Sequence, residues 1–338
     1  MREAMFWEKA EDGKVKCGLC LFRCLISEGH RGVCGVRENR GGVLQTLVYG
    51  KVVAENIDPI EKKPLFHYHP GSLSYSIATV GCNFRCLHCQ NAEISQWPRT
   101  PHPIPGKNLP PAEVVRRAKA ADCRSIAYTY TEPTIFYEYA YDTALLAHRE
   151  GIGNVFVTNG YTTPEALEHI ATYLDAANVD LKGFSEKFYH EVAGATLQGV
   201  LDTLRTYKKL GIWIEVTTLI IPGHNDSEAD LKGIARFIAR ELDPETPWHV
   251  TAFYPTYKMR DLPPTPVASL RKARQIGLAE GLKYVYQGNI PGEGGENTFC
   301  PACGQAVIER KGFRLGNVNI KGSRCVFCDG QLDGIGLG

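Results

Sequence analysis

The sequence lacks the apolar segments that membrane and secreted proteins carry. No apolar run among its 338 residues is long enough to span a bilayer, and residues 1–9 contain no apolar stretch of the kind found in a signal peptide. It also lacks an excess of charge of one sign. The formal net charge is +1, so no strong field favours nucleic acid or an anionic membrane surface as a partner. The expected location is therefore the cytoplasm, with neither nucleic acid nor membrane as a partner.

Cysteine, in contrast, is abundant, with 12 residues of which all but Cys123 fall into three groups. In a secreted mini-protein such groups would indicate disulfides. In a chain of this size without a signal peptide, clustered C-x-x-C units favour metal binding. The groups are Cys17, Cys20, Cys24 and Cys34; Cys82, Cys86 and Cys89; and Cys300, Cys303, Cys325 and Cys328.

The central group stands out by its spacing. Cys82, Cys86 and Cys89 are separated by three and then two residues, directly after the β-branched run 76–80. Three thiolates so close together can hold three irons of a 4Fe–4S cube, which leaves the fourth iron open to a small molecule. The alternatives are a zinc knuckle or chance, but zinc usually takes four ligands and no fourth is evident nearby.

The first group lies in a Cys-rich module predicted over residues 1–72. Four thiolates within the 18 residues 17–34 favour zinc or a second iron–sulfur cluster, the alternative being reduced, buried cysteines. Residues 43–53 alternate in polarity and break at glycine, which predicts a hairpin. Residues 58–67 are polar and bounded by prolines, which predicts a loop. The alternative interpretation is a solvated linker.

Between residues 73 and 292, strand-like and helix-like segments alternate. This β-α repeat predicts a parallel sheet with helical crossovers, and six units before the last strand indicate a partial (β/α)6 barrel of the TIM type. The expected strands are 74–80, 125–129, 154–158, 177–181, 213–221, 248–254 and 283–286, and the expected helices are 110–122, 135–150, 164–174, 199–210, 227–242 and 267–280.

Polar residues follow or end these strands, where the chemistry of such barrels is found. The central cysteines follow the first strand, and other polar groups stand at 130–134, 158–161, 180–183 and 221–226, with His249 on the sixth strand. Each signal is weak alone. Thr-Asn-Gly is common turn chemistry, Asp180 and Lys182 could form an ordinary ion pair, and His249 could be a core histidine. Their shared position after barrel strands favours a common functional site formed by these residues.

The last module, 293–338, carries two C-x-x-C pairs with 21 residues between the pairs. A glycine follows each pair at Gly304 and Gly330, the first directly and the second after Asp329. This pattern predicts a zinc-ribbon-like site in which four thiolates hold a structural ion, with an iron centre as the alternative. So small a module should need its metal to stay folded. No basic-aromatic surface accompanies it, which argues against nucleic-acid binding.

Taken together, these motifs resemble the radical S-adenosylmethionine (SAM) enzyme of the AmmeMemoRadiSam system, a relative of the pyruvate formate-lyase activating enzymes. The resemblance covers nearly the whole chain. It rests on the first cysteine group and on 58–64, 81–91, 130–134, 158–161, 180–183, 253–255, 258–259, 288–289 and the C-terminal C-P-x-C-G. The fold it implies is a radical SAM partial barrel with additional modules at both ends.

The resemblance also implies a reaction and its site. Cys82, Cys86 and Cys89 would hold the 4Fe–4S cluster, which reductively cleaves SAM to a 5′-deoxyadenosyl radical that abstracts hydrogen from a substrate. The implied SAM contacts are His88, Thr131, Glu132, Pro133, Asn159, Asp180, Lys182 and His249. Two departures stand out. His88 replaces the usual aromatic residue before the last cysteine, and Val157 replaces an acid of the related enzymes, which weakens transfer of their monovalent-cation site.

Several functions remain open from the sequence. The activating-enzyme resemblance implies activation of a partner enzyme by abstraction of hydrogen from a glycine. The alternative within the class is modification of a small molecule, or of a partner protein of the AmmeMemoRadiSam system. The alternative outside the class of radical SAM enzymes is a non-enzymatic metal scaffold or electron carrier. A protein of that kind would not cleave SAM. An enzyme of this type implies an electron donor such as flavodoxin or ferredoxin.

Overall fold

The computed structural model describes residues 2–97, 103–290 and 292–338. It forms two compact units. Unit 1 comprises residues 1–58 and 73–176, and unit 2 comprises 59–72 and 177–338. Each is described by itself. The three-module division at 72/73 and 292/293 remains a prediction about domain organisation. In the described part of the chain, no helix combines the length and apolarity needed to cross a membrane.

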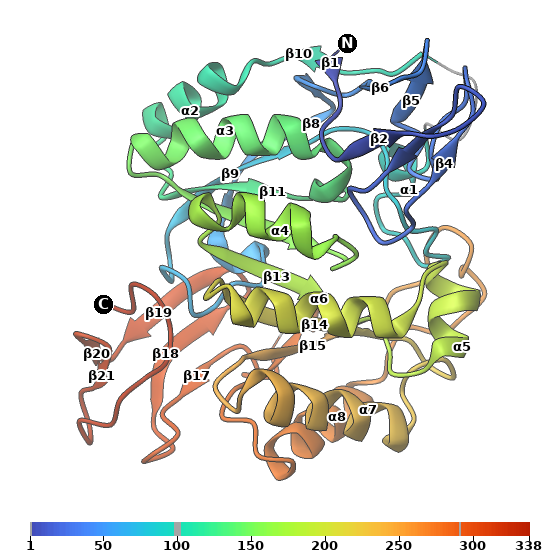
Figure 1. The fold of residues 1–338 in the computed structure, drawn as a ribbon. Helices are drawn as coiled ribbons and strands as arrows, with labels where there is room; N and C mark the ends of the chain where they lie inside the picture. Colours follow the sequence, from blue (N-terminus) through green and yellow to red (C-terminus); the bar gives the residue numbers. More distant parts are fainter. Residues whose placement is uncertain (1, 98–102, 291) are drawn as a thin grey trace. The chain divides into compact units, whose positions relative to one another are not determined.

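Unit 1 is built on parallel strands with helical crossovers, as predicted. β9 pairs with β11, and β11 pairs with β12. β11 is buried along its whole length, because helices α2 and α3 pack beside each other and against it (Figure 1). The elements are β8 (Ala54–Pro59), β9 (Leu73–Ala78), α1 (Ala92–Ser95), α2 (Pro111–Ala120), β11 (Ser125–Tyr128), α3 (Tyr137–Arg149), β12 (Gly153–Thr158) and α4 (Pro164–Ile170).

The N-terminal part of unit 1 forms small antiparallel sheets. β3 pairs with β2 and β4, and β6 pairs with β1 and β5. The hairpin predicted within 43–53 is wrong: β6 turns back on β5 through Gly41 and Gly42, both with positive φ, and β7 pairs with β10. The strands are β1 (Arg2–Glu3), β2 (Trp7–Lys9), β3 (Val15–Cys17), β4 (Leu25–Ile26), β5 (Arg37–Arg40), β6 (Val43–Thr46), β7 (Lys51–Val52) and β10 (Lys107–Asn108).

Unit 2 continues the β-α alternation. β14 pairs with β15 and β15 with β16, all parallel. Helices α7 and α8 lie side by side, and α8 packs on β15 and β16 (Figure 1). The elements are β13 (Ala176–Asp180), α5 (Glu186–Phe188), α6 (Leu197–Lys209), β14 (Trp213–Ile220), α7 (Glu228–Phe237), β15 (Trp248–Ala252), α8 (Val267–Ala279) and β16 (Val285–Gly288). The predicted α/β class with a mostly parallel central sheet is therefore confirmed.

The sequence predicts a loop over residues 58–67, with a solvated linker as the alternative. Residues 63–67 indeed form no helix or strand, but most of the segment is buried and not solvated. Residues 60–62 form a 3₁₀ turn, and Glu61, Phe66 and His67 are buried. Some of its backbone polar groups find partners elsewhere in unit 2. The Glu215 carboxylate accepts the backbone N–H groups of Phe66 and His67 at 3.0 and 2.7 Å. The polar composition of this segment suggested exposure to solvent. The segment is buried instead, because buried acids and bases can pair with each other.

The C-terminal module of unit 2 consists of short strands around a small core. β18 pairs with β17 and β19, and β20 pairs with β21. Two cysteines, Cys300 and Cys325, belong to this core together with Val307, Leu332 and Leu337. The strands are β17 (Thr298–Phe299), β18 (Ala306–Lys311), β19 (Arg314–Val318), β20 (Ile320–Lys321) and β21 (Arg324–Cys325).

Candidate functional site

The central cysteines lie on the loop that follows β9 in unit 1, as predicted. Gly81 starts this loop with φ +104°, and its N–H donates to the carbonyl of Ile94 at 3.0 Å. A Cβ at Gly81 would lie 2.7 Å from Cγ1 of Val36 and 3.1 Å from the carbonyl oxygen of Cys34. Only glycine fits at such a positive φ and such a close approach. The loop is therefore held against the N-terminal segment.

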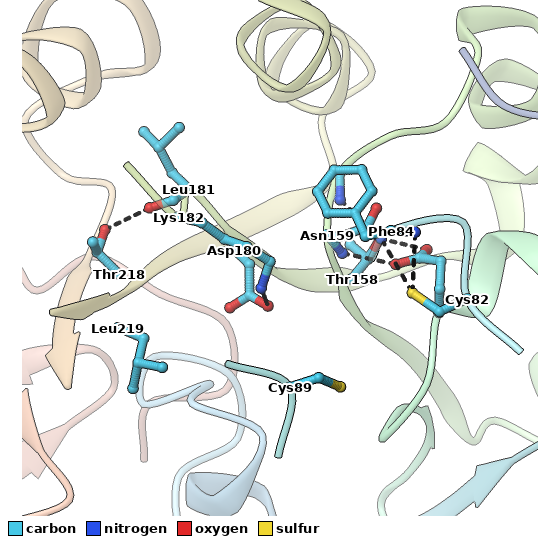
Figure 2. Close-up of polar contacts among 12 residues, drawn as sticks. Cys82, Phe84, Cys89, Thr158, Asn159, Asp180, Leu181, Lys182, Thr218 and Leu219 are labelled. Atoms are coloured by element: carbon cyan, nitrogen blue, oxygen red, sulfur yellow. Dashed lines mark hydrogen bonds and ion pairs between the residues drawn. The ribbon is translucent and has the colours of Figure 1, made fainter. Parts of the chain in front are cut away.

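The sulfur of Cys82 has two N–H donors near it. The backbone N–H of Phe84 lies 3.4 Å away, and the side-chain amide of Asn159 lies 3.7 Å away. Figure 2 shows both directed at this sulfur. Burial, followed by the charges of Glu132 and Cys86, raises the pKa of the Cys82 thiol well above its usual value. A thiolate at this position therefore needs a cation as partner.

Asn159 ties the cysteine loop to the end of β12. Its amide donates to Asn83 Oδ1 at 2.7 Å, and its backbone N–H donates to Glu132 Oε2 at 2.8 Å. Its own Oδ1 accepts from the N–H of Tyr161 at 3.1 Å. The Thr-Asn-Gly sequence is thus more than a turn, because it fixes an amide beside Cys82. Asn83 was missed by sequence reasoning, although it lies within the cysteine motif.

Glu132 is the anchor of this region and is only 2 % exposed. Its Oε1 accepts from the N–H and hydroxyl of Thr134 at 3.0 and 2.7 Å and from the Thr158 hydroxyl at 2.7 Å. Burial raises the pKa of this carboxyl, and the donors around it oppose that shift. Glu132 caps the 3₁₀ turn Pro133–Phe136. Its role in the structure is to lock the ends of β11 and β12 together.

The remaining predicted residues of unit 1 surround the same strand ends. His88 is buried in the cysteine loop, and Thr131 donates its hydroxyl to the Thr79 carbonyl at 2.8 Å. Tyr130, which sequence reasoning did not single out as a ligand, has φ +62° and accepts the side-chain amide of Asn91 at 2.8 Å. Its strained backbone was not readable from the sequence.

In unit 2, Asp180 and Lys182 form an ion pair at 2.7 Å at the end of β13 (Figure 2). The backbone of Lys182 is fixed on both sides: its N–H donates to the Tyr189 hydroxyl at 3.0 Å, and its carbonyl accepts from Asn225 at 2.6 Å. The prediction that Asp180 and Lys182 form an ion pair is therefore confirmed. Contact of this pair with SAM stays a prediction.

His249 has a partner that the sequence analysis missed. Its Nε2 lies 2.6 Å from Oε2 of Glu215 on the neighbouring strand β14, and both side chains are buried. Burial opposes ionisation of Glu215, but hydrogen bonds from His249 and its charge lower the pKa of this carboxyl. The signal for Glu215 was an acid inside the otherwise uncharged strand 213–220. Contact of His249 with SAM likewise stays a prediction.

The C-terminal cysteines come together as a four-sulfur set. The Sγ atoms of Cys300 and Cys328 lie 3.7 Å apart, and those of Cys303 and Cys325 lie 3.8 Å apart. All four lie within 4.8 Å of one another. Zinc–sulfur bonds of about 2.3 Å in a tetrahedron require sulfurs about 3.8 Å apart. The set therefore suits a single tetrahedral ion, and zinc itself stays a prediction.

Comparisons with known proteins agree with this geometry. The family model described as "Radical SAM superfamily" matches residues 76–238. The uncharacterized protein MJ0808 of Methanocaldococcus jannaschii is 51 % identical over 98 % of this chain and 99 % of its own length. The pyruvate formate-lyase-activating enzyme of Clostridium pasteurianum is 25 % identical over 61 % of this chain and 89 % of its own length.

A solved structure shares the fold. The radical SAM methyltransferase of Sphaerobacter thermophilus superposes with a TM-score of 0.51 at 17 % identity, over 70 % of this chain and 71 % of that one. The chain therefore belongs to the radical SAM superfamily, with pyruvate formate-lyase activating enzymes among its homologues, and this membership implies a 4Fe–4S cluster and SAM.

Proposed function

We propose that this chain is a radical SAM enzyme of the activating-enzyme type, in which Cys82, Cys86 and Cys89 hold the cluster. The observation that carries the proposal is the connected set Glu132, Asn159 and Cys82. A buried carboxylate fixes the backbone of Asn159, and Asn159 directs its amide at the sulfur of Cys82.

The residues fit the implied group. A buried thiolate at Cys82 is costly without a metal, and N–H donors to a ligating sulfur are a recognised way to tune an iron–sulfur cluster. When bound, the cluster and SAM supply a radical able to remove a hydrogen atom from an unactivated C–H bond. The protein supplies position and exclusion of water, through the locked ends of β9, β11 and β12.

The finer parts of the proposal rest on the relatives and the motifs. Hydrogen abstraction from a glycine of a partner enzyme is supported by the homologous pyruvate formate-lyase-activating enzyme. Assignment to the AmmeMemoRadiSam system is supported by the motif 58–64 and the two outer cysteine groups. We further propose that the parallel strands form a partial barrel, and that reduced flavodoxin or ferredoxin supplies the electron.

The test is anaerobic. The full chain is reconstituted with iron and sulfide, reduced with dithionite, mixed with SAM and assayed for 5′-deoxyadenosine. The expected result is 5′-deoxyadenosine from the native chain and none from Cys86→Ala. Cys123→Ala is the matched control, because Cys123 is also buried but belongs to no cysteine group. Cleavage retained in Cys86→Ala would overturn the cluster assignment.

A further inference from the structure

A buried carboxylate in unit 2 collects four N–H groups around itself. Glu215 lies on β14 and is wholly buried. Its Oε1 accepts the backbone N–H of His67 at 2.7 Å and the indole N–H of Trp213 at 3.2 Å. Its Oε2 accepts the backbone N–H of Phe66 at 3.0 Å and lies 2.6 Å from Nε2 of His249. With two donors on each oxygen, the carboxylate is fixed in one orientation.

This carboxylate decides which nitrogen of His249 carries the proton. Burial opposes ionisation of Glu215, but the hydrogen bond with His249 lowers the pKa of the carboxyl. An ionised carboxylate only accepts hydrogen bonds, so Nε2 of His249 donates to it. When the imidazole is neutral, its lone pair is then on Nδ1. This Nδ1 forms no hydrogen bond with a residue that the structure describes, so it is available to a ligand.

A second polar group without a partner lies on the same face of the sheet. Thr217 stands opposite His249 in the register of β14 and β15, so both side chains project from one face. The Thr217 hydroxyl is buried and has no hydrogen-bond partner in the described part of the chain. A buried hydroxyl without a partner is costly. The Thr217 hydroxyl and Nδ1 of His249 are therefore the groups that a polar ligand would meet here.

The C-terminal module reaches the same region through Arg310 on β18, whose side chain is buried. Its Nη2 donates to the Phe66 carbonyl at 2.9 Å. Its Nη1 donates to the Thr298 hydroxyl at 2.7 Å and to the Glu296 carbonyl at 3.2 Å. The guanidinium also lies over the Phe66 ring, 4.2 Å from the ring centroid. Arg310 therefore holds both the backbone and the ring of Phe66.

Glu61 balances the charge of Arg310 but does not hold its side chain by a hydrogen bond. Its Oε1 accepts the N–H of Gly71 at 2.9 Å and lies 3.7 Å from Nε of Arg310. That separation exceeds a hydrogen bond, and Nε has no other hydrogen-bond partner among the described residues. The geometry of Arg310 thus depends on its hydrogen bonds to Phe66 and to β17 and its neighbours, which makes Glu61 a useful control.

The ring of Phe66 in turn packs on His249. The two rings meet edge to face with centroids 4.7 Å apart. Tyr286 stacks on His249 at 5.0 Å and contacts Phe66 at 4.8 Å. The imidazole is therefore enclosed by two rings and tied at one end to Glu215. Movement of Phe66 would disturb both the packing of His249 and the carboxylate that orients it.

We propose that the C-terminal module positions His249, and that Arg310 is the positioning residue. Arg310 holds the backbone at Phe66, and the N–H groups of Phe66 and His67 orient the Glu215 carboxylate. Glu215 keeps the proton of His249 on Nε2 and leaves Nδ1 to accept a hydrogen bond from a hydroxyl or ammonium group of a ligand. That this ligand is SAM rests on the proposed function, whereas the positioning itself does not.

The first readout is the Nε2 proton of His249, followed by NMR in the full chain labelled with ¹⁵N-histidine, without iron or SAM. Its buried contact with Glu215 should give a slowly exchanging signal, assigned by its absence in His249→Gln. Arg310→Gln should lose this signal through faster exchange. Arg310→Lys should restore much of it, because lysine can still donate to the Phe66 carbonyl. An unchanged signal in folded Arg310→Gln would overturn the proposal.

Matched controls separate positioning from a general loss of stability. Glu61→Gln removes the charge partner of Arg310 but leaves its hydrogen bonds in place, so the signal should persist. Arg314→Gln removes an exposed arginine of the same module and should also preserve it. Loss of the signal in either control would assign the effect to stability of the module and contradict the role of Arg310.

Far-UV circular dichroism checks that each variant is folded. If Arg310→Gln does not fold, Thr298→Val takes its place, because it removes one acceptor of Arg310 and keeps the shape of the side chain. The Nε2 proton of His249 should then exchange faster than in the native chain. Equal exchange in folded Thr298→Val and the native chain would likewise overturn the proposal.

The second readout is the affinity of the cluster-loaded chain for SAM, measured by equilibrium dialysis. Arg310→Gln should raise Kd about fivefold, the value of one hydrogen bond, and Glu61→Gln should leave Kd unchanged. An unchanged Kd in a variant that has lost the His249 signal would contradict SAM as the ligand of His249. A native chain that binds no SAM would contradict the proposed function and leave the NMR result intact.

Discussion

Asn159 donates its side-chain amide to the sulfur of Cys82 at 3.7 Å. The two residues are 77 positions apart in the chain, and the same amide also donates to Asn83 Oδ1 at 2.7 Å. The contact joins the end of β12 to the loop after β9. One residue outside the cysteine motif therefore contributes to the surroundings of a sulfur that we propose to bind the cluster.

Loss of the Asn159 amide should make the proposed cluster harder to reduce. A hydrogen bond to sulfur stabilises the more negative, reduced state, and one such bond contributes about 1 kcal/mol. Asn159→Ala should therefore lower the midpoint potential measured by redox titration with EPR detection. Asn178→Ala is a suitable control, because Asn178 donates to the Pro64 carbonyl in unit 2. Equal potentials in Asn159→Ala and the native chain would show that this contact does not tune the cluster.

Glu132→Gln should destabilise unit 1 by about 3 kcal/mol. The amide nitrogen of glutamine would face either the Asn159 N–H or the Thr134 N–H, both of which need an acceptor. Chemical denaturation of the metal-free chain measures the loss without involving a cluster. Glu165→Gln serves as a control, because Glu165 is exposed. Equal stabilities of the two variants would contradict the anchoring role.

Gly81→Ala should cost about 3 kcal/mol, because a positive φ and a tight contact act together. The new Cβ would lie 2.7 Å from Val36 Cγ1. Val36→Ala in the same chain should recover part of the loss by removing that methyl group, while the strain of φ +104° would remain. A double-mutant cycle from denaturation midpoints measures the coupling. Strict additivity would mean that the loop does not press on Val36.

The stability of unit 2 should fall as the pH is lowered from about 6.5 to about 4. Burial lowers the pKa of His67 to about 4 from its usual 6.5, so the unfolded chain binds the proton first as the pH falls. The neutral ring is held by the Asp333 carbonyl at 2.6 Å and the Tyr286 hydroxyl at 2.5 Å. The loss over this window should be about 3 kcal/mol.

His67→Gln should flatten this part of the pH profile, measured by denaturation at several pH values. His190→Gln, on the short helical segment 189–193, is a control because His190 is exposed. A profile in His67→Gln as steep as in the native chain would assign the pH dependence to other groups.

If the C-terminal cysteines hold a metal as predicted, its removal should unfold 293–338 and leave the parallel strands intact. Burial raises the pKa of the Cys325 thiol, but the backbone N–H groups of Phe327 and Cys328 and hydrogen bonds with the Cys303 and Cys328 thiols outweigh burial and lower it. Hydrogen exchange after zinc chelation should increase over 298–333. Exchange in β14–β16 should change little. Unaltered protection of 298–333 after complete loss of metal would show that the small core of this module suffices without it.

The sequence by itself determined the α/β class, the β-α alternation from 73 to 288 and the position of the central cysteines after the first parallel strand. Buried parallel strands are continuous apolar and β-branched runs, and helices between them follow a local period. Such local signals can be read from the sequence without knowledge of the fold. Cysteine spacing is equally local, which is why the cysteine groups were recognisable.

Tertiary structure alone decided which polar residues meet. The pairing of Glu215 with His249, the burial of Phe66 and His67 and the pairing of β7 with β10 depend on contacts between distant segments. The approach of Cys34 to Gly81 does so as well. Buried charges are tolerated only where partners from elsewhere in the chain satisfy them. No local pattern encodes those partners, so the structural roles of Arg310 and Glu132 could be recognised only in the folded chain.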